Sequence, residues 1–282
     1  MNTIESFNKC LKYIDKVLDD EIDEKTVSTL SGYSYPLFKR IFSIITGITL
    51  SEYVRFRKLT FAAIDLRETN EKVIDIAIKY GYDSPDSFTT AFKKFHGFTP
   101  SEIRNGSPFK VFSRLQLKLS ITGGNEMNVS IQEKEAFIVA GIKEEHIESK
   151  NCPKVWDSLL EKFSQETLIN LGSGQSYGMC FETKDSSLIN YMACFNVKDI
   201  DKAKKLGLTI MEIPANNYAI VELNGPIPQS IHEGWKYVME RFFPEQGYQH
   251  SGAPDFEVYQ EGDMHSKNYK MELWIPIKKL NN

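Results

Sequence analysis

The sequence of 282 residues lacks any long apolar run, and charged residues begin at Glu5 and Lys9. No stretch approaches the roughly 20 apolar residues that cross a bilayer, so neither a signal peptide nor a membrane anchor is expected. Glycine and proline are scarce, at 17 and 11 residues, which excludes a low-complexity chain. We predict a cytoplasmic protein with no membrane partner.

Motifs for metals, disulfides and phosphates are also missing. The four cysteines form no CxxC pair, and the five histidines form no HxxxH or HxH pattern. Gly172-Ser-Gly174 lacks the lysine and the helix that follow a phosphate-binding loop. We therefore expect reduced thiols, no metal site, no cofactor and no catalytic residue.

What the chain does have is an uneven distribution of charge. The net charge of −4 combines 18 basic and 15 acidic residues in 1–125 with 16 basic and 23 acidic residues in 126–282. Acidic residues crowd into 1–30, so 31–104 is mildly basic. This balance permits nucleic-acid binding by the first part without establishing it.

Two stretches in the first part of the chain repeat each other. Residues 29–55 read TLSGYSYPLFKRIFSIITGITLSEYVR, and residues 78–104 read IKYGYDSPDSFTTAFKKFHGFTPSEIR. The shared positions are Gly32-Tyr33 with Gly81-Tyr82 at an offset of 49, and, at an offset of 50, Phe38 with Phe88, Phe42 with Phe92 and Gly47–Glu52 with Gly97–Glu102. Such self-similarity indicates two copies of one structural unit.

Each copy has the pattern of a short helix, a tight turn and a second helix. Val73, Ile74, Ala77 and Ile78 fall at helical spacing, and the glycine that follows suits a left-handed turn. Ser34 in one copy and Asp83 or Ser84 in the other are candidate N-caps, each followed by a proline in the first helical turn. The paired phenylalanines bury one face, while Lys39 and Arg40, or Lys93 and Lys94, occupy the other.

Residues 50–68 between the copies contain no glycine or proline and are predicted to form one helix, with Arg55, Arg57 and Lys58 open to solvent. A helix of this length spans roughly 27 Å at about 1.5 Å per residue. If the second helix of each copy were a DNA-recognition helix, a linker helix of this length would let the two reach successive major grooves, which lie about 34 Å apart. One chain therefore has the span for which helix-turn-helix proteins usually need a dimer, and if it binds DNA we expect it to do so as a monomer.

Residues 24–104 resemble the DNA-binding domain of AraC/XylS-family regulators, in the Rob-like arrangement where that domain comes first. The resemblance implies a transcription factor that binds double-stranded DNA and contacts RNA polymerase. It assigns the following residues to base reading: Ser34, Tyr35, Pro36, Lys39, Arg40, Ser84, Asp86, Ser87, Thr89, Thr90 and Lys93. Arg55, on the linker helix, is a further candidate for DNA contact, through phosphate. Pro36 in the first copy and Asp86 and Thr90 in the second depart from the side chains usual in the family. Because Thr90 cannot make the two-pronged contact of an arginine, the second copy is expected to contact phosphates more than bases.

A polar break at residues 105–108 places the expected domain boundary between 107 and 108. Alternating apolar residues then predict a hairpin over 115–131. A second repeat follows, in which Trp156 and Phe163 recur as Trp235 and Phe242 at an offset of 79. Strands are expected near 136–144, 176–182, 189–197, 208–224, 255–260 and 269–277, with helices near 153–165 and 229–243.

The predicted fold is thus an all-α domain with two helix-turn-helix units, residues 1–107, followed by an α+β domain of two β-α-β-β modules, residues 108–282. Residues 127–280 resemble the GyrI-like effector-binding domain, which implies a cleft for a small-molecule effector. Alternation in the last strand sends Leu273 to the core and leaves Glu272 and Trp274 on the other face. A carboxylate beside an indole suits a lipophilic cation, and the further candidate wall residues are Trp156, Trp235, Phe243 and Tyr248.

Two alternatives to effector sensing stay open at this point. The second domain is a hydrolase of small molecules, with Glu272 and a nearby tyrosine as base and acid, or it binds a protein partner. A pocket lined by aromatic residues around Glu272 would count against the second alternative.

Overall fold

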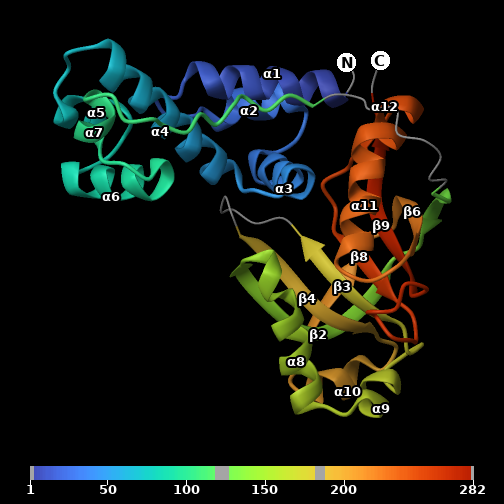
Figure 1. The fold of residues 1–282 in the computed structure, drawn as a ribbon. Coiled ribbons are helices and arrows are strands. Elements are labelled where there is room, and N and C mark those ends of the chain that lie inside the picture. The colour runs from blue at the N-terminus through green and yellow to red at the C-terminus, as the bar shows by residue number, and fades with distance from the viewer. Residues whose placement is uncertain (1–2, 118–126, 182–187, 281–282) are drawn as a thin grey trace. The chain divides into compact units, whose positions relative to one another are not determined.

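The computed structural model describes residues 3–117, 127–181 and 188–280, which form two compact units. The first unit consists of residues 3–35 and 48–117. The second unit combines residues 36–47 with the described residues from 127 onward. Figure 1 labels the elements of both units along the chain. Within the described residues, no helix is long and apolar enough to cross a membrane.

The first unit is helical. Its helices are α1 Thr3–Lys16, α2 Glu24–Ser31, α4 Leu50–Glu68, α5 Val73–Lys79, α6 Pro85–His96 and α7 Pro100–Arg104. Helix α4 has the bounds that the absence of glycine and proline predicts for the linker. Helix α1 was not predicted, although Phe7, Leu11 and Ile14 are buried along one of its faces.

The repeated sequence pattern corresponds to a repeated pair of caps. Gly97 ends α6 with a left-handed backbone, at φ +90°. Thr99 then opens α7 by accepting a hydrogen bond from the Glu102 amide at 3.3 Å, while the Glu102 carboxylate accepts one from the Thr99 amide at 2.7 Å. Thr49 and Glu52 form the same capping box at the start of α4. Each copy therefore specifies where one helix ends and the next begins.

The second helix-turn-helix copy packs against the linker helix. Phe88 and Phe92 of α6 are fully buried, together with Ile76 and Ala77 of α5 and the alanines of α4. Ile74 and Ile78 are 45% and 64% exposed, so helical spacing alone did not identify the buried face of α5.

The prediction that Arg57 faces solvent is wrong. Its Nε donates to Asp15 of α1 at 2.9 Å, its Nη1 donates to the Phe112 carbonyl at 2.6 Å, and the residue is buried. Arg55, two residues earlier, is exposed. Arg57 therefore stabilises the first unit and is not free to contact DNA.

The second unit contains helix α3 Tyr35–Thr46, whose residues 36–47 belong to it, and a sheet with several helices. The strands are β1 Val129–Lys134, β2 Phe137–Ile147, β3 Ser176–Phe181, β4 Ile189–Asn196, β5 Thr209–Ile213, β6 Asn216–Asn224, β7 Tyr248–His250, β8 Asp255–Tyr259 and β9 Lys270–Lys279. The helices are α8 Cys152–Lys162, α9 Gln165–Ile169, α10 Ile200–Lys205, α11 Gln229–Tyr237 and α12 Phe243–Gln246, with a π-helical turn at Val238–Phe242.

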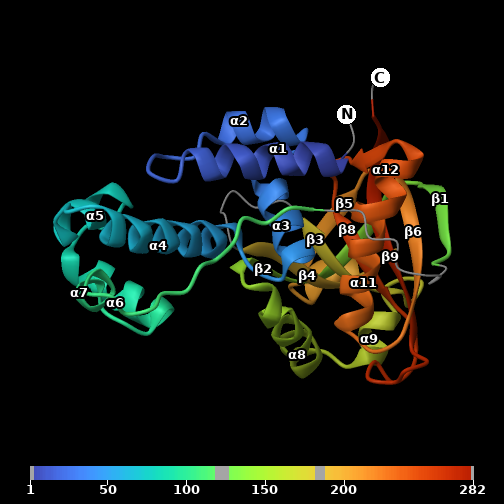
Figure 2. The same cartoon turned by 45° about the horizontal axis from the view of Figure 1, so that its top comes forward.

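All strand pairs are antiparallel, in the order β1-β6-β9-β8-β3-β4-β2-β5, with β7 beside β9. Strands β2, β3 and β4 of the first predicted module lie in one half of the sheet, and β6, β8 and β9 of the second lie in the other. The halves join where β3 pairs with β8, whereas β5 lies in the first half beside β2. The long helices α8 and α11 lie over the sheet (Figure 2). This is the two-domain fold that the repeats predict, with two β-α-β-β modules in the second domain.

Two details of the strand prediction are wrong. The expected strand 208–224 is two strands, β5 and β6, which pair with different neighbours because the chain turns between Ile213 and Asn216. The expected hairpin over 115–131 does not form in the described residues, since 115–117 are not in a strand and β1 pairs with β6. Residues 118–126 lie outside the described residues.

Candidate DNA-reading helices and effector site

Helix α6 presents a polar face opposite its buried phenylalanines. Asp86, Ser87, Thr90 and Lys93 are exposed and share that face, and Thr89 is half-buried beside it. The Ser84 hydroxyl accepts a hydrogen bond from the Ser87 amide at 3.2 Å. Ser84 is therefore the N-cap of α6, and its oxygen already has a partner inside the protein.

Arg55 lies on the linker helix beside an open hollow of about 330 Å³. The hollow is lined by Ile22, Tyr35, Leu50, Ser51, Val54, Arg55, Lys58, Tyr80, Gly81 and Tyr82. Two cations, Arg55 and Lys58, beside one hollow suit a phosphate of the DNA backbone.

Helix α3 does not present the cationic face that the repeat predicts. Phe38 and Phe42 are fully buried, as expected, but Lys39 is only 3% exposed and the Arg40 side chain only 14%. The prediction that these two cations face outward is wrong for this structure. A neighbouring part of the chain covers them, which an isolated helix pattern cannot reveal.

Arg40 binds to the sheet through Asp255, the first residue of β8. Both terminal nitrogens of its guanidinium donate to the two carboxylate oxygens of Asp255. The same guanidinium lies 5.4 Å from the ring centre of Trp235 on α11. Burial by itself lowers the pKa of Arg40, but the attraction of Asp255 outweighs this effect and raises it.

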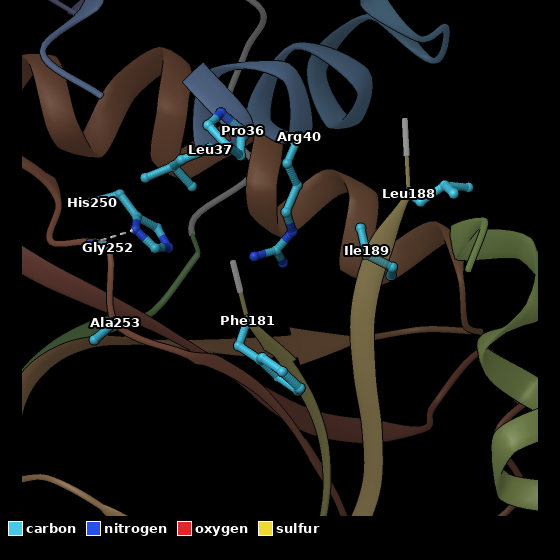
Figure 3. A pocket seen from close by; sticks show the side chains of 9 residues that line it. All are labelled: Pro36, Leu37, Arg40, Phe181, Leu188, Ile189, His250, Gly252 and Ala253. Carbon is cyan, nitrogen blue, oxygen red and sulfur yellow. Dashed lines mark hydrogen bonds between the residues drawn. The ribbon is translucent and has the colours of Figure 1, made fainter. Parts of the chain in front are cut away.

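A small cavity lies beside this ion pair (Figure 3). Pro36, Leu37 and Arg40 of α3 form one side, and the remaining lining residues are Phe181, Leu188, Ile189, His250, Gly252 and Ala253. The guanidinium of Arg40 points from α3 toward the strands. The cavity measures about 20 Å³, room for about one water molecule. It cannot hold an effector while α3 is in this position.

A second carboxylate, Glu257, lies on the same face of β8 among aromatic side chains. The hydroxyls of Tyr191 and Tyr259 both donate to its Oε2, the first over 3.3 Å. Trp156 on α8 donates from Nε1 to the Tyr191 oxygen at 2.9 Å, and its ring meets that of Tyr259 edge-on with centres 5.3 Å apart. Glu257 is half-buried, so solvent still reaches it.

The environment of Glu257 disfavours its charge. Burial raises the pKa of Glu257 despite the hydrogen bonds from Tyr259 and Tyr191. Gly178 on β3 lies opposite Glu257 in the register. A Cβ at position 178 would approach the Tyr191 hydroxyl to 2.3 Å and the Glu257 carboxylate to 2.6 Å, so glycine leaves the room that this cluster needs. An anionic group held among aromatic rings can bind a cation by charge and by cation–π attraction.

The predicted ligand residues are divided between the two faces of the sheet. Trp156 belongs to the Glu257 cluster, and Trp235 lies beside Arg40. Glu272 and Trp274 lie on the opposite face, where Trp274 packs among Tyr177, Tyr218 and Phe256 and donates to Glu272 at 2.7 Å. Phe243 is fully buried, and Tyr248 stacks on Phe242. The six therefore do not form one site.

Glu257 was missed although the sequence carries a signal for it. Asp255, Glu257 and Tyr259 alternate with Phe256 and Val258, which places two acids and a tyrosine on one face of a central strand. Acidic residues at such positions are costly to bury and indicate a site.

Comparison with known proteins agrees with both halves of this description. Residues 27–106 match a helix-turn-helix domain, and residues 127–278, more than half of the chain, match the GyrI-like small molecule binding domain. The chain belongs to the AraC/XylS family and carries a GyrI-like domain. It is a DNA-binding transcriptional regulator, and its DNA partner is double-stranded.

The relatives match the DNA-binding part. Over 94 residues the chain is 42% identical to the transposon Tn10 TetD protein of Escherichia coli, covering 33% of this chain and 68% of that protein. It is 37% identical over 95 residues to the regulatory protein SoxS of Salmonella typhimurium, covering 34% and 89%. A solved structure of SAV2435 bound to tetraphenylphosphonium matches with a TM-score of 0.47 and 22% identity, covering 54% of this chain and 94% of that one.

Proposed function

We propose that this regulator changes transcription when a lipophilic cation binds at Glu257 of its GyrI-like domain. The observation that carries the proposal is a half-buried carboxylate surrounded by Trp156, Tyr191 and Tyr259. Cation–π attraction to such rings contributes about 0.5–2 kcal/mol, and the carboxylate supplies the countercharge. Glu272 and Trp274 remain a second candidate pair on the other face.

Thermal unfolding of the full chain tests this proposal with tetraphenylphosphonium as the cation and triphenylphosphine oxide as a neutral aromatic control. A ligand at 100 times its dissociation constant adds about 2.7 kcal/mol to stability. We expect stabilisation by the cation alone. Equal stabilisation by both compounds, or no stabilisation by either, would contradict the proposal.

We further propose that the domain senses the compound without converting it. Residues 27–106 of the same chain match a helix-turn-helix domain, and fusion to such a domain favours sensing over catalysis. Glu257 and Tyr259 nevertheless form an acid–base pair of the kind that a hydrolase uses. Incubation of the full chain with an aromatic ester, followed by mass spectrometry, distinguishes the two, since a sensor returns the ester intact.

On DNA, Arg40 is proposed to contact base edges and Arg55 the phosphate backbone. Arg40→Ala should reduce the discrimination between a selected duplex and a scrambled one by about 1–3 kcal/mol. Arg55→Ala should weaken both duplexes alike. Fluorescence anisotropy on the two duplexes measures this difference, and unchanged discrimination in Arg40→Ala would remove Arg40 from the reading face.

The stoichiometry on DNA follows from the two copies on one linker helix. We propose that one chain occupies about two helical turns of an asymmetric site and contacts RNA polymerase from there. Analytical ultracentrifugation of the complex should give one chain per duplex. Binding only as a dimer on a palindrome would contradict this prediction.

A further inference from the structure

We propose that Asp255, His250 and Trp235 form a site that binds the guanidinium of Arg40 and so holds helix α3 on the GyrI-like domain. The helix is released when it binds DNA. The inference rests on the proposed function in treating α3 as a DNA-reading helix and, for its link to the effector, in placing the cation at Glu257. The site is a structural feature of the second unit and does not depend on which effector the domain binds.

The geometry of the site matches a guanidinium in shape as well as charge. Asp255 accepts two parallel hydrogen bonds from Arg40, and Trp235 covers the guanidinium at 5.4 Å. His250 stacks on Trp235 with ring centres 6.0 Å apart, and its Nε2 lies 3.5 Å from Asp255 Oδ2. A two-pronged contact together with an aromatic face is specific for arginine over lysine.

Asp255 needs a cation in this position because it is almost completely enclosed. Its side chain is 2% exposed, and a buried carboxylate without a partner is strongly destabilising. Its other close neighbour, His250, does not provide the charge, because burial lowers the pKa of His250 and favours the neutral ring. Arg40 is therefore the group that neutralises Asp255.

Binding to Asp255 and reading of DNA exclude each other. An arginine contacts guanine through the same pair of donors that Arg40 gives to Asp255. The cavity beside α3 holds about one water molecule, so the helix is seated against the domain. In this conformation α3 is not available to DNA. The apparent DNA affinity is therefore the intrinsic affinity multiplied by the fraction of chains in which α3 is released.

The position of Glu257 links this contact to the effector. Asp255 and Glu257 lie two residues apart on one face of β8, about 7 Å along the strand. A cation bound at Glu257 repels Arg40 and weakens its hold on Asp255. The effector should therefore favour release of α3 and tighten DNA binding, and DNA should tighten effector binding by the same factor.

The direct test compares Asp255→Asn with the wild-type full chain on a duplex selected from a random library by the wild-type chain. We expect Asp255→Asn to bind this duplex about tenfold more tightly by anisotropy, because Asn cannot neutralise and hold Arg40. Asp157→Asn, an exposed residue on α8, removes the same charge elsewhere and should change affinity less than about twofold. The proposal would be overturned if Asp255→Asn bound the duplex no more tightly than the wild type, or no more tightly than Asp157→Asn.

A second measurement needs no variant and remains decisive if Asp255→Asn fails to fold. Amide exchange of residues 250–255 in the wild-type chain should increase when the duplex saturates the protein, because α3 then leaves this region. Unchanged exchange there would overturn the proposal. Arg40→Ala can keep full discrimination between the two duplexes while Asp255→Asn still binds DNA more tightly. That result would support the Arg40–Asp255 contact as a restraint on α3 and refute the proposal that Arg40 contacts bases.

Discussion

Glu257→Gln is expected to lower the affinity for tetraphenylphosphonium on the order of 100-fold, because it removes the charge but keeps the shape of the side chain. The amide oxygen still accepts hydrogen bonds from Tyr191 and Tyr259, so the cluster should stay folded. Isothermal titration calorimetry of the full chain measures the change.

Glu272→Gln is the matched control, since it makes the same exchange on the opposite face of the sheet. If Glu272→Gln loses the cation and Glu257→Gln does not, the sequence-based assignment of Glu272 is correct and the site lies on the other face. Equally small losses of cation affinity in both variants would show that neither glutamate is the counter-ion of the cation.

The same variant has a consequence for the pH dependence of stability. The pKa of Glu257 is raised in the folded chain by burial, from a usual value of 4.5. The folded state therefore holds its proton more tightly than the unfolded state, and stability falls as the pH rises from 4.5 through the folded pKa. Glu257→Gln has no carboxyl group at this position, so it does not lose stability in this way as the pH rises. Its melting temperature should exceed that of the wild type at neutral pH, and the difference should vanish in acid.

Cation affinity should follow the opposite course. Only the charged form of Glu257 attracts a cation, so affinity should rise as the pH increases through the folded pKa. Calorimetry across this range in wild type and in Glu257→Gln separates the charge of Glu257 from the surrounding rings. A cation affinity that does not change with pH would argue against Glu257.

Local patterns in the sequence were sufficient for much of the fold. The repeated glycine and Thr-x-x-Glu motifs are short-range signals, which end α6 and open α4 and α7 in the structure, although α7 itself was not predicted. The bounds of α4 follow from composition alone. In the second domain, the repeated Trp and Phe positions predict α8 and α11 because each helix packs on its own module.

The errors concern contacts between distant segments. Arg57 looks like a solvent-facing residue until Asp15 of α1 is placed beside it, and Arg40 looks like an outward-facing cation until it is paired with Asp255. The Glu257 cluster needs residues from β4, β8 and α8 in one place. The alternation within β8 points to Glu257 itself, but no periodicity within a single element identifies its partners on β4 and α8.

Leu273→Ala is expected to lower the free energy of unfolding of the second unit by about 2–5 kcal/mol, because it leaves a cavity in a packed interface. Leu273 is fully buried in β9, between Val221 and Glu257 in the register. Its Cδ2 lies 3.4 Å from the position that a Cβ would occupy at Gly234 of α11, so its side chain faces that helix as the alternation predicts.

The measurement can be confined to the relevant part of the full chain. All three tryptophans, Trp156, Trp235 and Trp274, lie in residues 127–280, so their fluorescence during denaturant unfolding reports on that part. Leu160→Ala on α8 is the matched control, since Leu160 is 47% exposed and the change should cost less than about 1 kcal/mol. A Leu273→Ala chain as stable as Leu160→Ala would mean that β9 turns its other face to α11, and Glu272 would then lie on the helix side with Trp156 and Trp235.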